Sequence, residues 1–266
     1  MSLATTRCRN TKFRWGERTY IMGILNLSPD SFSGDGLGRD MAAIAARAKQ
    51  MLADGADIID VGGESTRPAA QPITVDEELR LVIPAIERLA IEVSVPLSID
   101  TYKPEVASRA LGAGANMLND VWGFQYDLGL AQVAGKAGVP VVLVSNQRRN
   151  PGHYDIITEV ISFLKRSIGL AESAGIAGQN IIIDPGIGFG KSPEQNLEII
   201  RRLSELKVLG KPILLGTSRK FAGKQATLAT VAIGIAHGAD MVRVHDVRQA
   251  VSVVRMSDAI VRKAVE

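Results

Sequence analysis

Eight short apolar runs, spaced along the whole chain, constrain its fold more than any other feature. The runs span residues 20–26, 56–61, 96–100, 115–120, 140–144, 180–184, 212–216 and 240–246. They lack a regular alternation of apolar and polar residues, which is typical of parallel strands covered on both faces. The longer segments between them, such as DMAAIAARAKQMLADG, repeat apolar residues at intervals of three and four, the period of an α-helix.

The number of strand–helix units favours a closed barrel over an open sheet. Eight units of roughly thirty residues each are what a (β/α)8 barrel requires. A doubly wound open sheet is the alternative, but no linker or change of composition divides the chain. We therefore expect an α/β fold with one domain over residues 1–266, a single (β/α)8 TIM barrel.

Composition narrows the compartment and the class of partner. Cys8 is the only cysteine, so an internal disulfide is impossible and a reducing, cytoplasmic location is expected. No apolar stretch is long enough for a signal peptide or a membrane helix. The net charge of +3 is spread along the chain and aromatic residues make up 5%, which disfavours nucleic-acid binding. We expect a small-molecule ligand, with a weak preference for an anion.

Nearly all of the expected strands end on polar side chains. These ends are Asn26, Asp60, Asp100, Asn119, Asp120, Ser145, Asn146, Gln147, Asp184, Ser218, Arg219, Lys220, Arg243 and His245. A polar strand end is common in any protein, because loops contact water. In a (β/α)8 barrel, however, the active site lies at the carboxyl ends of the strands. The whole ring therefore indicates a functional site more strongly than any one member does.

The segment DPGIGFGK at 184–191 predicts recognition of a planar nitrogen heterocycle. Its three glycines leave space beside the carboxylate of Asp184, which can accept two parallel hydrogen bonds from paired N–H groups. A 2-amino-4-oxo ring, such as a pterin or a guanine, presents such a pair, and Phe189 can lie against its face. The alternative is a turn in which Asp184 caps the following helix.

Three further strand ends suit the remaining edges of such a ring. Asp100 and Asn119 end adjacent strands and offer hydrogen-bond acceptors and donors, and Lys220 can donate to a ring carbonyl or nitrogen. As alternatives, Asp100 and Asn119 are buried loop anchors and Lys220 is a solvated surface lysine.

Cationic side chains at the last strand suit a phosphate group. Arg243 and His245 alternate along this strand, so they point the same way, and both donate hydrogen bonds. The alternative for Arg243 is an ion pair inside the barrel with Asp60 or Asp100.

Two residues from the first loops extend the expected phosphate site. Arg67 adds a cation, and Asn26 can reach a Mg²⁺ ion that keeps its waters and bridges phosphate oxygens. The sequence contains no nucleophile elbow, Walker loop or His/Cys metal cluster, so covalent catalysis is not indicated. Positioning and electrostatics would have to carry the reaction.

Seven segments together resemble the dihydropteroate synthase family. In chain order they are IMGILNLSPDSFSGDG, GADIIDVGGESTRPAA, LSIDTYKPEVASRAL, MLNDVWG, IIIDPGIGFGKSPEQN, LLGTSRK and VRVHDV. The resemblance implies a (β/α)8 barrel that condenses 6-hydroxymethyl-7,8-dihydropterin diphosphate with 4-aminobenzoate in folate biosynthesis. It also implies a transferase that forms homodimers and is a target of sulfonamides.

The resemblance assigns a role to each candidate residue. It implies that the pterin is held by Asp100, Asn119, Asp184 and Lys220, and the diphosphate with its Mg²⁺ by Asn26, Thr66, Arg67, Arg243 and His245. Of these, the residues expected to be catalytic are Asp100, Lys220, Arg243 and His245. The loops at 28–32 and 65–68 are expected to close over aminobenzoate.

Two segments depart from the family pattern. After the fifth run many members have Met-His, whereas Ser145 and Asn146 stand in this chain. After Lys220 the family usually has a serine and a longer segment, whereas Phe221 follows here and the chain runs almost directly into the next helix. Two other functions stay open. One is a related barrel that transfers a methyl group from methyltetrahydrofolate to a corrinoid protein, and the other is a non-catalytic paralogue that binds pterin.

Overall fold

The computed structural model describes residues 3–28, 40–65, 70–149 and 155–262. Within these ranges no helix combines the length and the apolar character needed to cross a bilayer.

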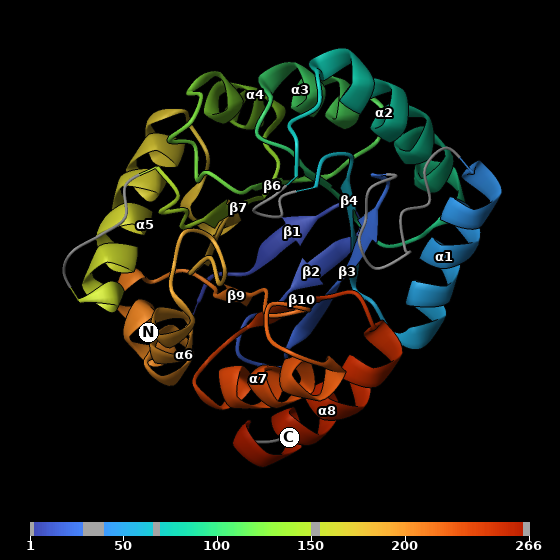
Figure 1. The fold of residues 1–266 in the computed structure, drawn as a ribbon. Helices are drawn as coiled ribbons and strands as arrows, with labels where there is room; N and C mark the ends of the chain where they lie inside the picture. Colours follow the sequence, from blue (N-terminus) through green and yellow to red (C-terminus); the bar gives the residue numbers. More distant parts are fainter. Residues whose placement is uncertain (1–2, 29–39, 66–69, 150–154, 263–266) are drawn as a thin grey trace.

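Eight parallel strands form the barrel that the sequence predicts (Figure 1). The strands are β3 (Tyr20–Asn26), β4 (Ile58–Gly62), β5 (Leu97–Asp100), β6 (Met117–Asp120), β7 (Val141–Val144), β8 (Ile181–Asp184), β9 (Leu214–Leu215) and β10 (Met241–Val244). Each strand lies within one of the eight apolar runs or ends one residue beyond it. Neighbouring strands pair from β8 round to β9, and a parallel bridge between Ile183 and Ile213 closes the ring.

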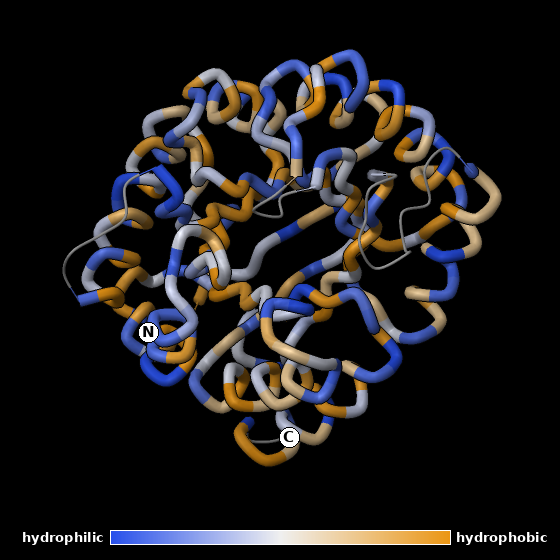
Figure 2. Tube along the Cα trace, viewed as in Figure 1, coloured by the Kyte–Doolittle hydropathy of each residue, from blue (hydrophilic) through white to orange (hydrophobic). Residues whose placement is uncertain are grey.

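A helix follows each barrel strand and covers its outer face (Figure 1). The helices are α1 (Met41–Asp54), α2 (Val75–Glu92), α3 (Pro104–Gly112), α4 (Gly129–Ala137), α5 (Ile156–Ser173), α6 (Pro193–Arg201), α7 (Lys224–Ala236) and α8 (Val247–Val261). Along most of these helices polar and apolar residues alternate with the turns, as Figure 2 shows, because one helix face meets the strands. Ser192 caps α6, and Gln195 returns the hydrogen bond.

An N-terminal hairpin that the sequence did not predict lies across the amino ends of the barrel strands. It consists of β1 (Thr6–Cys8) and β2 (Thr11–Phe13), which pair antiparallel. The Cys8 thiol lies 3.2 Å from the carbonyl of Asn116, just before β6, and Thr6 accepts a hydrogen bond from Trp15 Nε1 at 2.9 Å. Phe13, Trp15 and Tyr20 pack on one another and continue the apolar interior of the barrel.

The inside of the barrel changes from apolar to polar along the strands. The apolar layer contains Met22, Ile58, Met117, Val142, Ile182, Leu214 and Met241. Because side chains alternate along a strand, the next inward residue lies two positions further on. On β4, β5, β6, β8 and β10 this layer contains Asp60, Asp100, Asn119, Asp184 and Arg243. The polar side chains therefore lie above the apolar layer, at the carboxyl ends of the strands.

Candidate active site

Arg243 joins the polar strand ends into one hydrogen-bonded cluster. Its Nε donates to Asp60 Oδ2 and its Nη2 to Asp100 Oδ2, each over 2.6 Å. Asn119 Nδ2 donates to the same Asp60 oxygen over 3.0 Å. Burial lowers the pKa of Arg243, but the two carboxylates outweigh it and hold this pKa above its ordinary value. The ion pair that the sequence left open for Arg243 is therefore present with both acids.

Three acceptor atoms in this cluster lack a hydrogen-bond partner within the described part of the chain. They are Asp60 Oδ1, Asp100 Oδ1 and Asn119 Oδ1, and all three are buried. A buried acceptor without a donor costs about 1–3 kcal/mol. Burial raises the pKa of Asp100 to about 7, although Arg243 opposes the shift. A ligand with several N–H groups would satisfy these atoms.

Asp184 is a buried carboxylate held by the turn that follows it. Its Oδ1 accepts from the backbone N–H of Gly186 over 2.7 Å, whereas Ser192 caps the next helix, so the helix-cap alternative for Asp184 is wrong. Burial raises the pKa of Asp184 to about 6, and the Gly186 hydrogen bond opposes this shift. Gly186 has φ +73°, and a Cβ on it would lie 1.9 Å from the Ser145 carbonyl oxygen. Only glycine fits there.

Lys191 stabilises the same turn and was missed by the sequence reasoning. Its Nζ donates to the carbonyl oxygens of Ser145 and Gly186 over 2.8 and 3.1 Å. Burial lowers the pKa of Lys191 to about 7, with Asp184 opposing the shift. The sequence showed no sign of this role for Lys191, because one of the carbonyl groups that it contacts, that of Ser145, belongs to a different loop.

Phe189 and Lys220, two residues that the sequence assigns to the heterocycle, lie together. Lys220 Nζ is 4.6 Å from the centre of the Phe189 ring, and the Arg148 guanidinium carbon is 4.9 Å from it. Desolvation lowers the pKa of Lys220 to about 8, and the charges of Arg243 and Arg148 act in the same direction. The Lys220 amine is thus held against an aromatic face beside two other cations.

Asn26, His245 and Ser218 form a second polar group at the mouth. His245 Nε2 lies 3.3 Å from Asn26 Nδ2, and its Nδ1 lies 2.9 Å from Ser218 Oγ. Arg47, on α1, donates to the His245 carbonyl over 3.0 Å. Asn26 ends β3, and His245 directly follows β10, which pairs with β3. The structure thus brings together two residues that the sequence assigns to the phosphate site.

Comparison with known proteins identifies the family. Residues 22–245 match the family of pterin binding enzymes. The dihydropteroate synthase of Clostridium beijerinckii is 47% identical over 264 residues, which cover 95% of this chain and 98% of that protein. This chain belongs to the dihydropteroate synthases. Two solved members of the family have closely similar folds.

The first of these solved structures is the Clostridium difficile dihydropteroate synthase determined in the presence of pteroic acid. It has a TM-score of 0.90 and 48% identity, covering 94% of this chain and all of that one. The second is the Xanthomonas albilineans dihydropteroate synthase with 4-aminobenzoic acid. It has a TM-score of 0.88 and 39% identity, covering 97% and 98% of the two chains.

Two residues expected from the family resemblance, Thr66 and Arg67, lie outside the described residues. The chain on either side of them is fixed by Lys103, which follows β5. Lys103 Nζ donates to Glu64 Oε2, Glu78 Oε2 and the Ile73 carbonyl, each over 2.7 Å. The sequence did not predict this charged group, because its members are far apart along the chain.

The segments that depart from the family pattern are well packed. Asn146 is buried and donates to the Val121 carbonyl over 3.0 Å, and the Ser145 carbonyl accepts from Lys191. Residues 221–223 alone join Lys220 to α7. Phe221 packs on the apolar cluster beneath α5 and α6.

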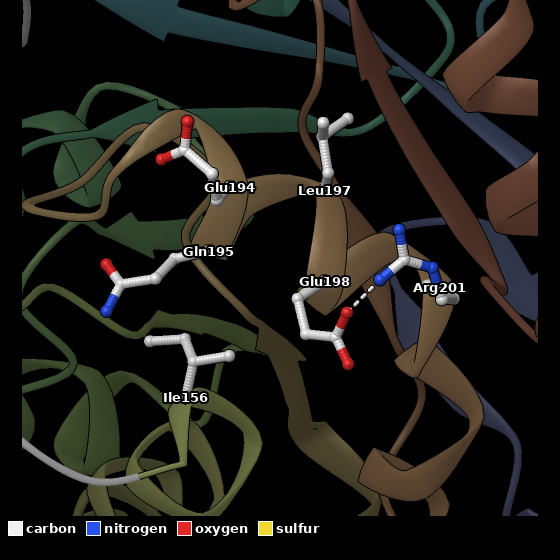
Figure 3. A pocket seen from close by; sticks show the side chains of 6 residues that line it. All are labelled: Ile156, Glu194, Gln195, Leu197, Glu198 and Arg201. Atoms are coloured by element: carbon white, nitrogen blue, oxygen red, sulfur yellow. Dashed lines mark hydrogen bonds and ion pairs between the residues drawn. The ribbon is translucent and has the colours of Figure 1, made fainter.

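A surface pocket of about 400 Å³ lies away from the strand ends, on helices α5 and α6 (Figure 3). Its lining residues are Ile156, Glu194, Gln195, Leu197, Glu198 and Arg201. None of these was predicted as a site residue, and the only ion pair drawn there is a surface pair between Glu198 and Arg201.

Proposed function

We propose that this chain condenses 6-hydroxymethyl-7,8-dihydropterin diphosphate with 4-aminobenzoate, giving 7,8-dihydropteroate and diphosphate. The observation that carries the proposal is the match to dihydropteroate synthases over nearly the whole chain, with 47% identity to the Clostridium beijerinckii protein. Membership of this family makes the protein a transferase of folate biosynthesis. The relatives solved with pteroic acid and with 4-aminobenzoic acid support both the product and the second substrate.

In this proposal the acidic strand ends hold the pterin. The unpartnered oxygen of Asp100 accepts a hydrogen bond from a ring N–H group, and that of Asn119 accepts from the 2-amino group. Asp184 accepts from the same amino edge. Lys220 donates to the oxygen or nitrogen of the opposite edge, and Phe189 supports its amine. The burial of these acceptor oxygens supports the assignment. Because they are removed from water, a hydrogen bond from the pterin stabilises them more than it would at the surface.

The departing diphosphate is assigned to the second polar group and to the cations beside it. Arg243 and His245 would donate to its oxygens, together with Thr66 and Arg67. The bond between the pterin methylene carbon and the diphosphate oxygen breaks, and the aminobenzoate nitrogen forms a bond to the same carbon and loses a proton. Fixed cations lower the barrier by stabilising the charge that develops on the leaving oxygen.

A Mg²⁺ ion at Asn26 fits this arrangement in part. With Nδ2 of Asn26 turned to His245, its Oδ1 is the atom left for a cation. Within the described ranges, no three His, Cys, Asp or Glu side chains group as metal ligands. Mg²⁺ commonly keeps several waters and takes other oxygens from a substrate phosphate. When bound, the ion would supply further neutralisation of the diphosphate charge.

We also propose that two copies of the chain associate through α7 and α8. These neighbouring helices leave Ile233, Met256 and Ile260 exposed by 47%, 64% and 74%. An apolar surface on adjacent helices is typical of a contact between subunits. Sedimentation should give a dimer that Ile233→Glu dissociates. The matched control is Ile91→Glu, which changes an isoleucine that is 88% exposed on α2 and should leave the dimer intact.

The catalytic proposal is tested with purified protein, Mg²⁺ and the pterin diphosphate. Diphosphate should be released and dihydropteroate formed only when 4-aminobenzoate is added. Pterin binding measured by calorimetry without any product would instead identify a non-catalytic paralogue. Methyl transfer from methyltetrahydrofolate to a corrinoid protein, without any dihydropteroate, would also overturn the proposal.

A further inference from the structure

Asp60 contacts two of the predicted ligand side chains without being one of them. It lies on β4 and is fully buried. Asn119 reaches its Oδ2 from β6 on one side, and Arg243 reaches the same atom from β10 on the other side. Asp60 therefore lies between groups assigned to opposite parts of the substrate.

The contact with Asp60 fixes which end of the Asn119 amide faces the site. A side-chain amide has one donating and one accepting end, whereas a carboxylate only accepts. The Nδ2 group of Asn119 must therefore face Asp60, 3.0 Å away, because the reverse orientation would bring two oxygens together. The accepting end, Oδ1, is left buried and without a partner in the described structure.

The same carboxylate fixes the guanidinium of Arg243. Nε donates to Asp60 and Nη2 to Asp100, so two of the guanidinium nitrogens are tied to acids on adjacent strands. Two such bonds define the plane of the group. The Arg243 side chain is 19% exposed, so its remaining surface faces the mouth of the barrel.

We propose that Asp60 is a positioning residue that determines specificity for the heterocycle. By holding the Asn119 amide in one orientation, Asp60 presents an acceptor, so the site selects a ring that donates an N–H group at that place. An analogue with a carbonyl in the same position would meet the Asn119 oxygen and be rejected. This inference rests on the proposed function, because it takes the bound ring to be a pterin.

Calorimetry with two ring analogues tests the proposal. The probes are 6-hydroxymethylpterin and the corresponding lumazine, which has a 2-oxo group in place of the 2-amino group. In Asp60→Ala the Asn119 amide is free to turn, so the preference for pterin over lumazine should narrow by about tenfold or more. Asp60→Asn keeps an oxygen where Asn119 and Arg243 donate, so it should restore most of the preference.

Ser98→Ala is the matched control. Ser98 lies opposite Asp60 in the β4–β5 pairing, is buried, and has a hydroxyl without a partner in the described residues. Its removal should leave the preference unchanged. If Asp60→Ala does not fold, Asp60→Ser replaces it, because the shorter hydroxyl cannot accept from both donors.

The outcomes separate this inference from the proposed function. A folded Asp60→Ala or Asp60→Ser protein with the wild-type preference would show that Asp60 has no role in specificity. If Ser98→Ala reduces the preference for pterin over lumazine by the same amount, the cause is a general change in packing, and the inference is also overturned. Failure of the unchanged protein to bind either ring or to form dihydropteroate would count against the function itself.

Discussion

Replacing Asp184 by asparagine should weaken pterin binding while the protein stays folded. The amide oxygen can still accept from Gly186 N–H, which Asp184 Oδ1 does over 2.7 Å. The other carboxylate oxygen becomes an NH₂ group that faces the N–H donors of the ring. One hydrogen bond to a charged group contributes about 1.5–3 kcal/mol, so we expect a loss of about 2 kcal/mol. That corresponds to an affinity about thirtyfold lower.

The assay is calorimetric titration of 6-hydroxymethylpterin into the two proteins at pH 8. Asp120→Asn is the matched control, because Asp120 is an equally buried acid whose oxygens already accept from the backbone N–H groups of Trp122 and Phe124. The control should lose stability but keep its affinity for the pterin. An Asp184→Asn protein that binds as tightly as the unchanged protein would remove Asp184 from the pocket.

The pH dependence of stability gives an independent check on Asp184. Burial raises its pKa to about 6, so the folded protein binds this proton more tightly than the unfolded chain does. The ligand-free protein therefore loses stability from this group as the pH rises from about 4 to above 6. The melting temperature of Asp184→Asn minus that of the unchanged protein should therefore be larger at pH 8 than at pH 4.5. The same difference at both pH values would contradict the assignment.

Three further substitutions test other parts of the site. Lys103→Met leaves the buried Glu78 and the partly buried Glu64 without their cation, so denaturant titration should show a loss of about 3–5 kcal/mol in the free energy of unfolding. A loss below about 1 kcal/mol would mean that the acids find other partners. Gly186→Ala forces a Cβ into a neighbouring carbonyl, so it should abolish pterin binding, and retained affinity would show that the turn can move. Lys220 has its pKa lowered to about 8, so turnover should fall above pH 8. In Lys220→Arg this fall should disappear, and its persistence would assign it to another group.

The barrel could be predicted because its elements depend on local composition. Each apolar run long enough to be buried on both faces became a strand, and Ser192 with Pro193 started a helix where helix caps usually occur. The hairpin of β1 and β2 was missed, because three-residue strands such as Thr6–Cys8 carry too few residues for any periodic pattern. They are stabilised by contacts with the ends of distant strands.

The sequence could nominate individual residues of the candidate site but not the network that joins them. The sequence alone showed that acids and amides end the predicted strands. These ends were expected to lie together, because parallel strands in a barrel bring their carboxyl ends to one mouth. It also left Arg243 with two possible roles, a phosphate ligand or an ion pair. Only the tertiary structure decided that Arg243 contacts both Asp60 and Asp100, and its role toward phosphate stays a prediction. The ion pairs depend on distances between strands that are far apart in the sequence.

The amino-acid sequence by itself determined the eightfold repeat of strand and helix, and the family to which the chain belongs. Only the tertiary structure placed Lys103 between Glu64 and Glu78, and Lys191 among the carbonyl groups of two loops. The physical reason is that periodic burial is encoded locally. The partner of a buried charge, in contrast, is set by which segments the closed barrel brings within hydrogen-bonding distance.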